Sequence, residues 1–288
     1  MMPDRAITSA VLVASVLACL PAAAVAGVPG SSGGMGSADT TVEPDFAWRK
    51  RVPAGQTVAI RGIRGNVRVE LASGGETEIT AVKRGSRGDG VSVIARENDG
   101  GVAVCALYPS NRSDGMSASH CGVDEHVVNA RSSNTQVDFH VKLPAGVRLD
   151  VRTVEGEVRV SDLRSDVRVS TVGGAVTMQG MRARRVEATT VSGRVDFIGE
   201  FLGDGDYRFT STSGAVSIGI NPDADARLTV ISRFGRVRSD FPWQRSVPLE
   251  AGGGAVEPAL QARLGSGGAH LVVRTLSGAV TLREAVRP

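Results

Sequence analysis

The chain has 288 residues and a net charge of +3, with 33 basic side chains against 30 acidic ones. Proteins that bind nucleic acids usually carry a strong excess of basic residues, and this chain does not. No nucleic-acid partner is therefore expected. Aromatic residues make up only 4% of the chain, which leaves few side chains on which a sugar could stack.

Residues 1–26 predict a signal peptide. Arg5 precedes an apolar run over 6–20, and small residues end the segment at Ala26, the expected cleavage point. The run is too short for a good membrane span, so no transmembrane span is expected after signal removal. The alternative is a lipoprotein signal in which Cys19 is the lipid-anchored residue. Both alternatives predict export, to the periplasm or the cell surface.

A stretch rich in Gly, Ser, Thr and Pro over 27–43 predicts a flexible leader. The next predicted region, 44–143, opens with an outlying copy of a repeat and continues with plain strands. Those strands are expected at Glu78–Lys83, Val91–Ala95, Val102–Leu107 and Val137–Leu143. Our interpretation is an inserted antiparallel sheet near the N-terminus, packed against the first repeats.

Residues 144–288 predict a serial β-strand repeat. In each copy, apolar residues alternate with polar ones on both sides of a glycine, the pattern of half-buried strands. Counting the outlying copy, the anchoring glycines are Gly65, Gly156, Gly174, Gly193, Gly214, Gly235 and Gly278. From Gly156 onward they follow at 18, 19, 21 and 21 residues and then at 43, so one copy is skipped or replaced. A period near 20 is typical of repeat architectures.

From Gly156 onward, a hydroxyl residue stands three positions before each anchoring glycine, for example Thr171, Thr190 and Thr275. We predict an all-β protein whose copies form a β-solenoid, with stacked rungs of about 18–21 residues and a ladder of hydroxyls that satisfy one another. The glycine suits a corner that needs positive φ or has no room for a Cβ. The alternative is a meander of hairpins, with Glu155 and Gly156 as one two-residue turn. In that case the threonines reflect β-propensity alone.

Several motifs together resemble one known family. They are the segment 52–55 (Val-Pro-Ala-Gly), the segment 143–146 (Leu-Pro-Ala-Gly), the serial Thr-x-Ser-Gly-x-Val copies and the closing segment 264–273. The match covers roughly residues 46–284 and is similar to the exported bacterial β-strand-repeat family known as "putative adhesin", or toast-rack domains. The resemblance implies a solenoid-like fold, association with the cell envelope or envelope-stress systems, and no catalytic residues. The segment 108–134 is an addition to the family pattern.

Two cysteines, Cys105 and Cys121, remain after signal removal, and in an exported chain they predict a disulfide. The alternative is a metal cluster formed by Cys121 with neighbouring ligand-type residues, although their spacing matches no recognised site. Those neighbours are His120, Asp124, Glu125 and His126.

Four aspartates precede two successive copies and are candidate calcium ligands if the corners stack. They are Asp204, Asp206, Asp223 and Asp225. The type of chemistry is right, but acidic turns are common in all proteins. No firm metal site and no cofactor are therefore predicted.

The sequence contains no Gly-x-Ser-x-Gly elbow, phosphate-binding glycine loop or His-Glu-x-x-His motif. We therefore predict a non-enzymatic envelope protein that serves adhesion, scaffolding or envelope-stress sensing. Outward arginines suggest anionic envelope polymers, lipid headgroups or envelope proteins as partners. The alternative is a polysaccharide-active β-helix enzyme using surface carboxylates, for which Glu155 and Glu157 are the nearest candidates.

Overall fold

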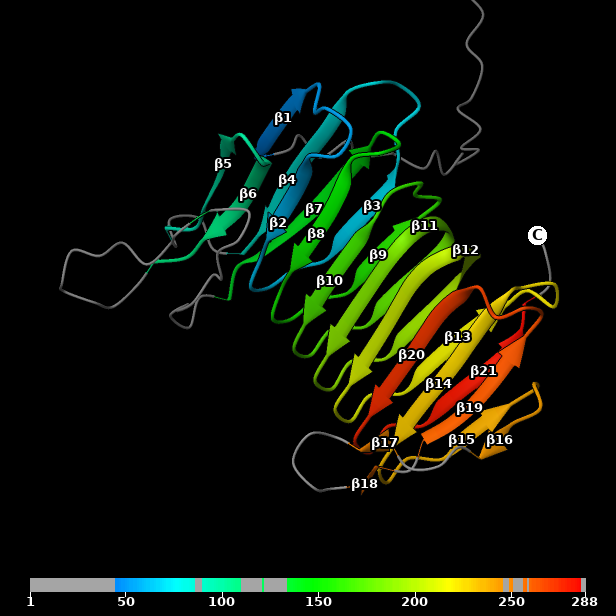
Figure 1. Ribbon diagram of the computed structural model, residues 1–288. Coiled ribbons are helices and arrows are strands. Elements are labelled where there is room, and N and C mark those ends of the chain that lie inside the picture. Colours follow the sequence, from blue (N-terminus) through cyan, green and yellow to red (C-terminus); the bar gives the residue numbers. More distant parts are fainter. Residues whose placement is uncertain are drawn as a thin grey trace, which may run out of the picture. The chain divides into compact units, whose positions relative to one another are not determined.

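A computed structural model describes residues 45–85, 90–109, 121, 134–245, 249–250, 256–257 and 259–285. The predicted signal peptide and leader, 1–26 and 27–43, lie outside the described residues. All regular structure in the described residues is β-strand, without a helix, which confirms the all-β prediction (Figure 1).

Nineteen strands form one sheet, and β17 and β18 form a second, two-stranded sheet. The strands up to residue 143 are β1 (Phe46–Lys50), β2 (Thr57–Arg61), β3 (Val67–Leu71), β4 (Thr77–Arg84), β5 (Ser92–Asn98), β6 (Gly101–Leu107) and β7 (Gln136–Leu143). The remaining strands are β8 (Arg148–Arg152), β9 (Val158–Ser161), β10 (Val167–Thr171), β11 (Val176–Thr190), β12 (Val195–Ser211), β13 (Val216–Ile220), β14 (Ala226–Ser232), β15 (Val237–Ser239), β16 (Gln244–Arg245), β17 (Leu249–Glu250), β18 (Val256–Glu257), β19 (Ala259–Leu264), β20 (Ala269–Thr275) and β21 (Val280–Glu284).

Equivalent strands of successive copies pair in parallel and in register, as Figure 1 shows for β8, β10, β11 and β12. Val167 lies opposite Leu149 on one side and Val186 on the other. After the glycine corner, Val176 lies between Val158 and Val195 in the same way. This pairing is the one expected for stacked copies, and it differs from a hairpin pairing within each copy.

The order of the copies in space differs from their order in the sequence. Strand β20 lies between β12 and β14, and β21 lies between β13 and β15. The last copy, anchored by Gly278, is therefore inserted between the copies anchored by Gly214 and Gly235. This insertion explains the long interval of 43 residues between Gly235 and Gly278. The copy anchored by Gly235 comes earlier in the sequence but lies farther along the stack, and the later copy lies between it and the copy anchored by Gly214.

The N-terminal strands differ in part from the predicted antiparallel insertion. Strands β6 and β7 pair in parallel with β2 and β3, so they form a further layer of the same stack. The antiparallel strands are β5 on β6, β4 on β7 and β1 on β4. At the other end, β19 pairs antiparallel with β14 and β16 with β19. Antiparallel strands therefore cover much of both ends of the stack, where open edges would invite pairing with other chains.

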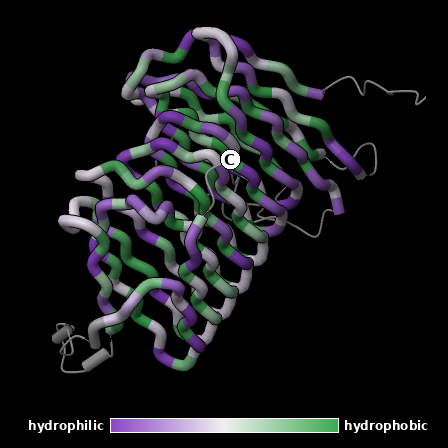
Figure 2. Tube along the Cα trace, turned by 90° about the vertical axis from the view of Figure 1, so that its right-hand side faces the viewer, coloured by the Kyte–Doolittle hydropathy of each residue, from purple (hydrophilic) through white to green (hydrophobic). Residues whose placement is uncertain are grey.

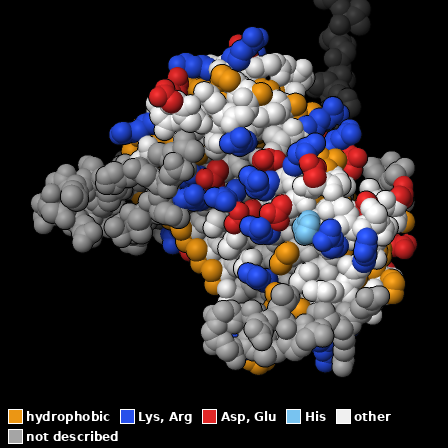
Figure 3. Space-filling model, viewed as in Figure 1, with side chains coloured by type: hydrophobic (Ala, Val, Ile, Leu, Met, Phe, Trp, Pro, Cys, Tyr) orange, Lys and Arg blue, Asp and Glu red, His pale blue; other side chains and the backbone are white. Residues whose placement is uncertain are grey.

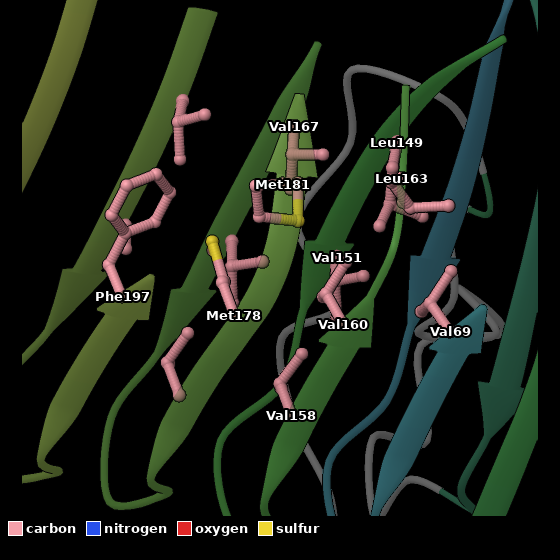
Figure 4. Close-up of a cluster of buried hydrophobic side chains, with 14 of the residues drawn as sticks. Val69, Leu149, Val151, Val158, Val160, Leu163, Val167, Met178, Met181 and Phe197 are labelled. Atoms are coloured by element: carbon pink, nitrogen blue, oxygen red, sulfur yellow. The ribbon is translucent and has the colours of Figure 1, made fainter. Parts of the chain in front are cut away.

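The core lies between the two layers of strands. Figure 2 shows hydrophobic and hydrophilic residues alternating along the strands, because successive side chains point to opposite faces. In Figure 4, Leu149, Val151 and Val167 approach Val160 and Met178 across the core. All five side chains are at most 2% exposed. Burial of apolar area on this scale is the main stabilising term of the fold.

The anchoring glycines are required by close packing of the backbone. A Cβ placed on Gly193 would overlap the carbonyl oxygen of Gly174, and each later copy repeats this contact with the copy before it in the stack. The expected positive φ holds at Gly65 and Gly156, where φ is 119° and 134°, but Gly193 has no positive φ. Space, more than backbone conformation, therefore demands glycine in most copies.

The hydroxyl ladder forms differently from the prediction. Thr190 Oγ1 accepts a hydrogen bond of 2.9 Å from the backbone N–H of Gly193 in its own copy. Thr171 and Thr275 do the same for their anchoring glycines, at 3.2 and 2.8 Å. These three hydroxyls therefore satisfy backbone groups of the corner, as in turns closed by Ser or Thr side chains. The buried Thr153 Oγ1 and Ser211 Oγ of the same ladder have no hydrogen-bond partner among the described residues.

We predict that the inward valine and the corner glycine determine stability, whereas the outward arginine between them does not. Val195→Ala should cost about 1.5–3 kcal/mol, because it leaves a cavity in a packed interior. Gly193→Val should cost at least as much, because its side chain overlaps Gly174. Arg194→Ala should cost less than about 0.5 kcal/mol, since Arg194 forms only an exposed pair with Asp196. Denaturant titration measures all three, and an Arg194→Ala cost equal to that of Val195→Ala would contradict the assigned faces.

Tyr207 is buried where the register of β11 against β12 shifts, between Ala183 and Arg185. Its hydroxyl donates to Ala183 O at 2.7 Å and accepts from Leu202 N–H at 2.8 Å. Its ring packs against Phe201, with centroids 4.6 Å apart. Burial raises the pKa of Tyr207 from 10.0 to about 12.

This pKa shift predicts a loss of stability in alkali. The folded state holds the neutral phenol, so its contribution is complete below pH 10 and is lost as the pH rises toward 12. A shift of this size corresponds to roughly 2–3 kcal/mol. Urea titrations below pH 10 and near pH 12 should show a larger loss for the wild type than for Tyr207→Phe. Equal losses would show that Tyr207 does not ionise on unfolding.

Candidate functional site

The outward side chains of β8, β10, β11 and β12 form two rows of alternating charge, here called the charged face. One row places Asp150, Arg168, Glu187 and Arg208 next to one another in register. The other row, two residues earlier in each copy, consists of Arg148, Asp166, Arg185 and Asp206. Figure 3 shows the basic and acidic side chains interspersed over this side of the molecule.

Neighbouring charges on this face partly neutralise one another. Arg168 pairs with Glu187 at 2.9 Å, and Arg208 pairs with Asp206 at 2.8 Å. These pairs are exposed, so each stabilises the fold by less than about 1 kcal/mol. Asp166 accepts a hydrogen bond from the backbone N–H of Arg185 at 3.0 Å.

Two arginines of the face are left over. Within the described part of the chain, neither the Arg148 nor the Arg185 guanidinium has an ion-pair or hydrogen-bond partner. Both are exposed. Arg148 lies on β8 and Arg185 on β11, with β10 between the two strands. Strand spacing separates their backbones by about 10 Å. The face therefore offers two unpaired cations at a fixed separation.

The surface is hollowed where these arginines stand. A depression of about 220 Å³ is lined by Arg148, Arg168 and Arg185, together with Asp150, Asp166 and Glu187. A second depression, of about 340 Å³, shares Arg168, Arg185 and Glu187 with the first. A third, of about 430 Å³, lies on β14, β19 and β20, beyond β12, and its lining includes Arg227, Arg263 and His270. The first two hollows therefore lie on the charged face, and the third lies on the strands next to it.

A buried ion pair anchors one end of the charged face. Arg61 is 0% exposed and donates to Asp150 Oδ2 at 2.8 Å and to Asp150 O at 2.8 Å. Arg152 approaches the same carboxylate at 3.4 Å. Breaking a buried pair leaves a desolvated charge, so both partners constrain the position of β8 against β2.

The predicted disulfide is present between Cys105 and Cys121. Cys105 lies opposite Arg61 in the pairing of β6 with β2. Both cysteines pack in a small apolar cluster with Ala59 and Ala103, on the outer side of these strands. The disulfide therefore covers the end of the sheet next to the buried ion pair. The alternative metal cluster loses Cys121 to this bond, and its other members lie outside the described residues.

The candidate calcium ligands are not brought together. Asp204 pairs with Arg184 and Asp206 with Arg208. Among the residues that the structure describes, no group of three or more His, Cys, Asp or Glu side chains is placed to hold a metal ion. Asp223 therefore joins no such group.

Asp225 has a structural role in a turn. Its carboxylate accepts hydrogen bonds from Ser266 Oγ at 2.6 Å and from the N–H of Gly267 at 2.7 Å. The Ser266 hydrogen bond, followed by that of Gly267, lowers the pKa of Asp225. This carboxylate fixes the turn between β19 and β20.

The acid pair considered for catalysis is also engaged. Glu155 pairs with Arg64 at 3.0 Å, and Glu157 pairs with Arg159 at 2.7 Å. Neither carboxylate is a member of the charged face.

The charged face was not predicted from the sequence, although the sequence contains a signal for it. The two rows stand six and eight residues before successive anchoring glycines, and the sign of the charge alternates from copy to copy in each row. Aligning the copies on their glycines would have revealed both rows.

No protein-family model matches the chain, and no curated protein matches it in sequence. Two solved structures are similar to it. One is a "putative cell adhesion protein" from Clostridium sporogenes, with 11% identity and a TM-score of 0.40, covering 84% of this chain and 100% of that one. The other is a "putative adhesin" from Bacteroides fragilis, with 10% identity and a TM-score of 0.28, covering 83% and 96%. Similarity at this level does not establish a shared function.

None of the described residues forms a helix that could cross a membrane.

We predict that the disulfide stabilises the protein by about 3 kcal/mol, because it closes a loop with a sequence separation of 16 residues in the unfolded chain. The variant Cys105→Ala/Cys121→Ala should lose this amount in denaturant titration. Reduced wild type is the control and should match the variant. A reduced wild type as stable as the oxidised one would contradict the prediction.

Proposed function

We propose that the chain is a non-enzymatic, exported cell-envelope protein of the adhesion type, which binds anionic envelope polymers on its charged face. The observation that supports this most directly is the pair of exposed, unpaired guanidinium groups of Arg148 and Arg185 above one depression. Planar guanidinium groups bind carboxylates and phosphates through two parallel hydrogen bonds. The proposed ligand is therefore a polymer with repeated carboxylate or phosphate groups.

We further propose that the parallel stack is a β-solenoid whose regular strand spacing holds the ligand-binding side chains at fixed distances from one another. Parallel pairing sets the distance between equivalent side chains of neighbouring copies at about 4.8 Å. The acidic residues between the arginines repel a uniformly charged chain. The face thus favours a polymer whose anionic groups are about 10 Å apart, matching Arg148 and Arg185.

The disulfide supports an oxidising location, such as the periplasm or the cell surface. The signal peptide, and its alternative with a lipid anchor on Cys19, remain predictions. Adhesion is the role proposed here. Scaffolding and envelope-stress sensing are the alternative roles for the same surface.

The binding proposal predicts a specific loss of affinity. Binding of hyaluronate, which carries one carboxylate per disaccharide, should weaken about tenfold or more in Arg148→Ala/Arg185→Ala when it is measured by titration calorimetry, because each change removes a charge-assisted contact. The matched control is Arg159→Ala/Arg194→Ala, in which both arginines are exposed but already paired. Neutral dextran should not bind, and added salt should weaken hyaluronate binding. Equal losses in the two double variants, or no binding by the wild type, would contradict the proposal.

A further inference from the structure

One row of the charged face, the row that includes Arg185 and Asp206, continues beyond β12 onto β20, β14 and β19, which follow β12 in the sheet (Figure 1). There it consists of His270, Arg227 and Arg263, which lie next to one another in register. All three side chains are exposed. The alternation of sign therefore stops at Asp206, and the row ends in a group that we call the basic cluster: His270, Arg227 and Arg263.

The two arginines of the basic cluster are an unfavourable pair for the sheet. Arg227 lies directly opposite Arg263 in the antiparallel pairing of β14 with β19, and like charges in this position destabilise a sheet. The acidic neighbours are engaged elsewhere: Asp206 pairs with Arg208 at 2.8 Å, and Asp225 accepts hydrogen bonds within the turn between β19 and β20. Among the residues that the structure describes, no carboxylate forms an ion pair with either arginine of the cluster.

The turn between β19 and β20 holds both arginines in place. Arg227 Nε donates to Gly267 O at 2.7 Å, and Arg263 Nη2 donates to Ser266 O. Both side chains pack against Gly267, because a Cβ placed there would lie 3.3 Å from Arg227 Nε and 3.0 Å from Arg263 Nε. Gly267 is buried, although it belongs to a turn. The two arginines therefore converge on one point, and their ordering before a ligand binds lowers the entropic cost of binding.

The basic cluster lines the third hollow, of about 430 Å³. Acidic residues line the two hollows of the charged face, whereas none of the described residues that line the third hollow is acidic. Thr229 and Gln261 add a hydroxyl and an amide to the lining, and both groups can donate hydrogen bonds. A hollow lined by cations and donors fits a small group with several acceptor oxygens and more than one negative charge.

We propose that the basic cluster binds the phosphate group of a soluble phosphate monoester. Such a group carries a charge of about −1.5 to −2 at about pH 7 and has three strong acceptor oxygens. The planar guanidinium groups can each donate two parallel hydrogen bonds to it, and a neutral imidazole adds one N–H donor. A carboxylate, with one charge and two oxygens, would leave part of the cluster unpaired. This site is independent of the polymer proposed for the charged face.

The surroundings of the hollow favour a soluble ester over a lipid headgroup. A surface that binds membranes usually places large apolar side chains beside its cations. In the described part of the chain, none of the well-exposed large hydrophobic side chains lines this hollow. The lining residues Leu228 and Leu271 are only 1% and 0% exposed.

Titration calorimetry with inorganic phosphate and with glycerol phosphate tests the site. Arg227→Gln and Arg263→Gln should each weaken binding about tenfold or more, because each removes a charge-assisted contact. The matched control is Arg238→Gln/Arg283→Gln, which removes two exposed arginines from the other layer of strands and should bind like the wild type. Arg148→Ala/Arg185→Ala should also keep phosphate binding, which separates this site from the charged face.

Thermal unfolding distinguishes a binding role from a structural one. Without phosphate, Arg263→Gln should be at least as stable as the wild type, because it removes a like-charge contact. Phosphate should raise the unfolding temperature of the wild type more than that of Arg263→Gln, since the general effect of the salt is common to both proteins.

Three results would overturn the proposal. The first is the absence of phosphate binding by the wild type. The second is an equal rise in unfolding temperature for the wild type and both single variants. The third is binding to vesicles of phosphatidic acid without binding to inorganic phosphate or glycerol phosphate, which would assign the basic cluster to a membrane surface.

Discussion

The structure depends on the close approach of successive copies at their glycine corners. At Gly174, Gly193 and Gly214 the carbonyl of the preceding copy occupies the space that a Cβ would need. Because the backbones touch there, every strand after the corner begins at the same height as its neighbour. Register errors of one residue would turn each inward valine to solvent, so the corners determine which side chains form the core.

The same register arranges the outer surface. Once the inward residues are aligned, the outward residues of neighbouring copies must also meet, which brings Asp150, Arg168 and Glu187 into one row. Alternating signs make this row favourable for stacking, since like charges directly opposite one another are destabilising. The proposed ligand site uses the two arginines that this alternation leaves without partners. A surface for binding thus follows from the requirement for ordered stacking.

The ends of the stack are the places where pairing with other chains must be controlled. Antiparallel strands cover much of the two ends, and the disulfide holds Cys121 against β6.

Local alternation was sufficient to predict the inward valines of the repeat, because it depends on neighbours within one copy. The glycine period indicated which of these valines pair between successive copies. The pairing of the two cysteines followed from their even number in a chain with a predicted signal peptide. The sequence could not show that the Gly278 copy lies before the Gly235 copy, or that β6 and β7 extend the stack, because order in space depends on contacts between distant segments. It also could not place Arg61 against Asp150, 89 residues away. Burial of that pair results from packing of β2 on β8 beside the disulfide, which only the tertiary structure decides.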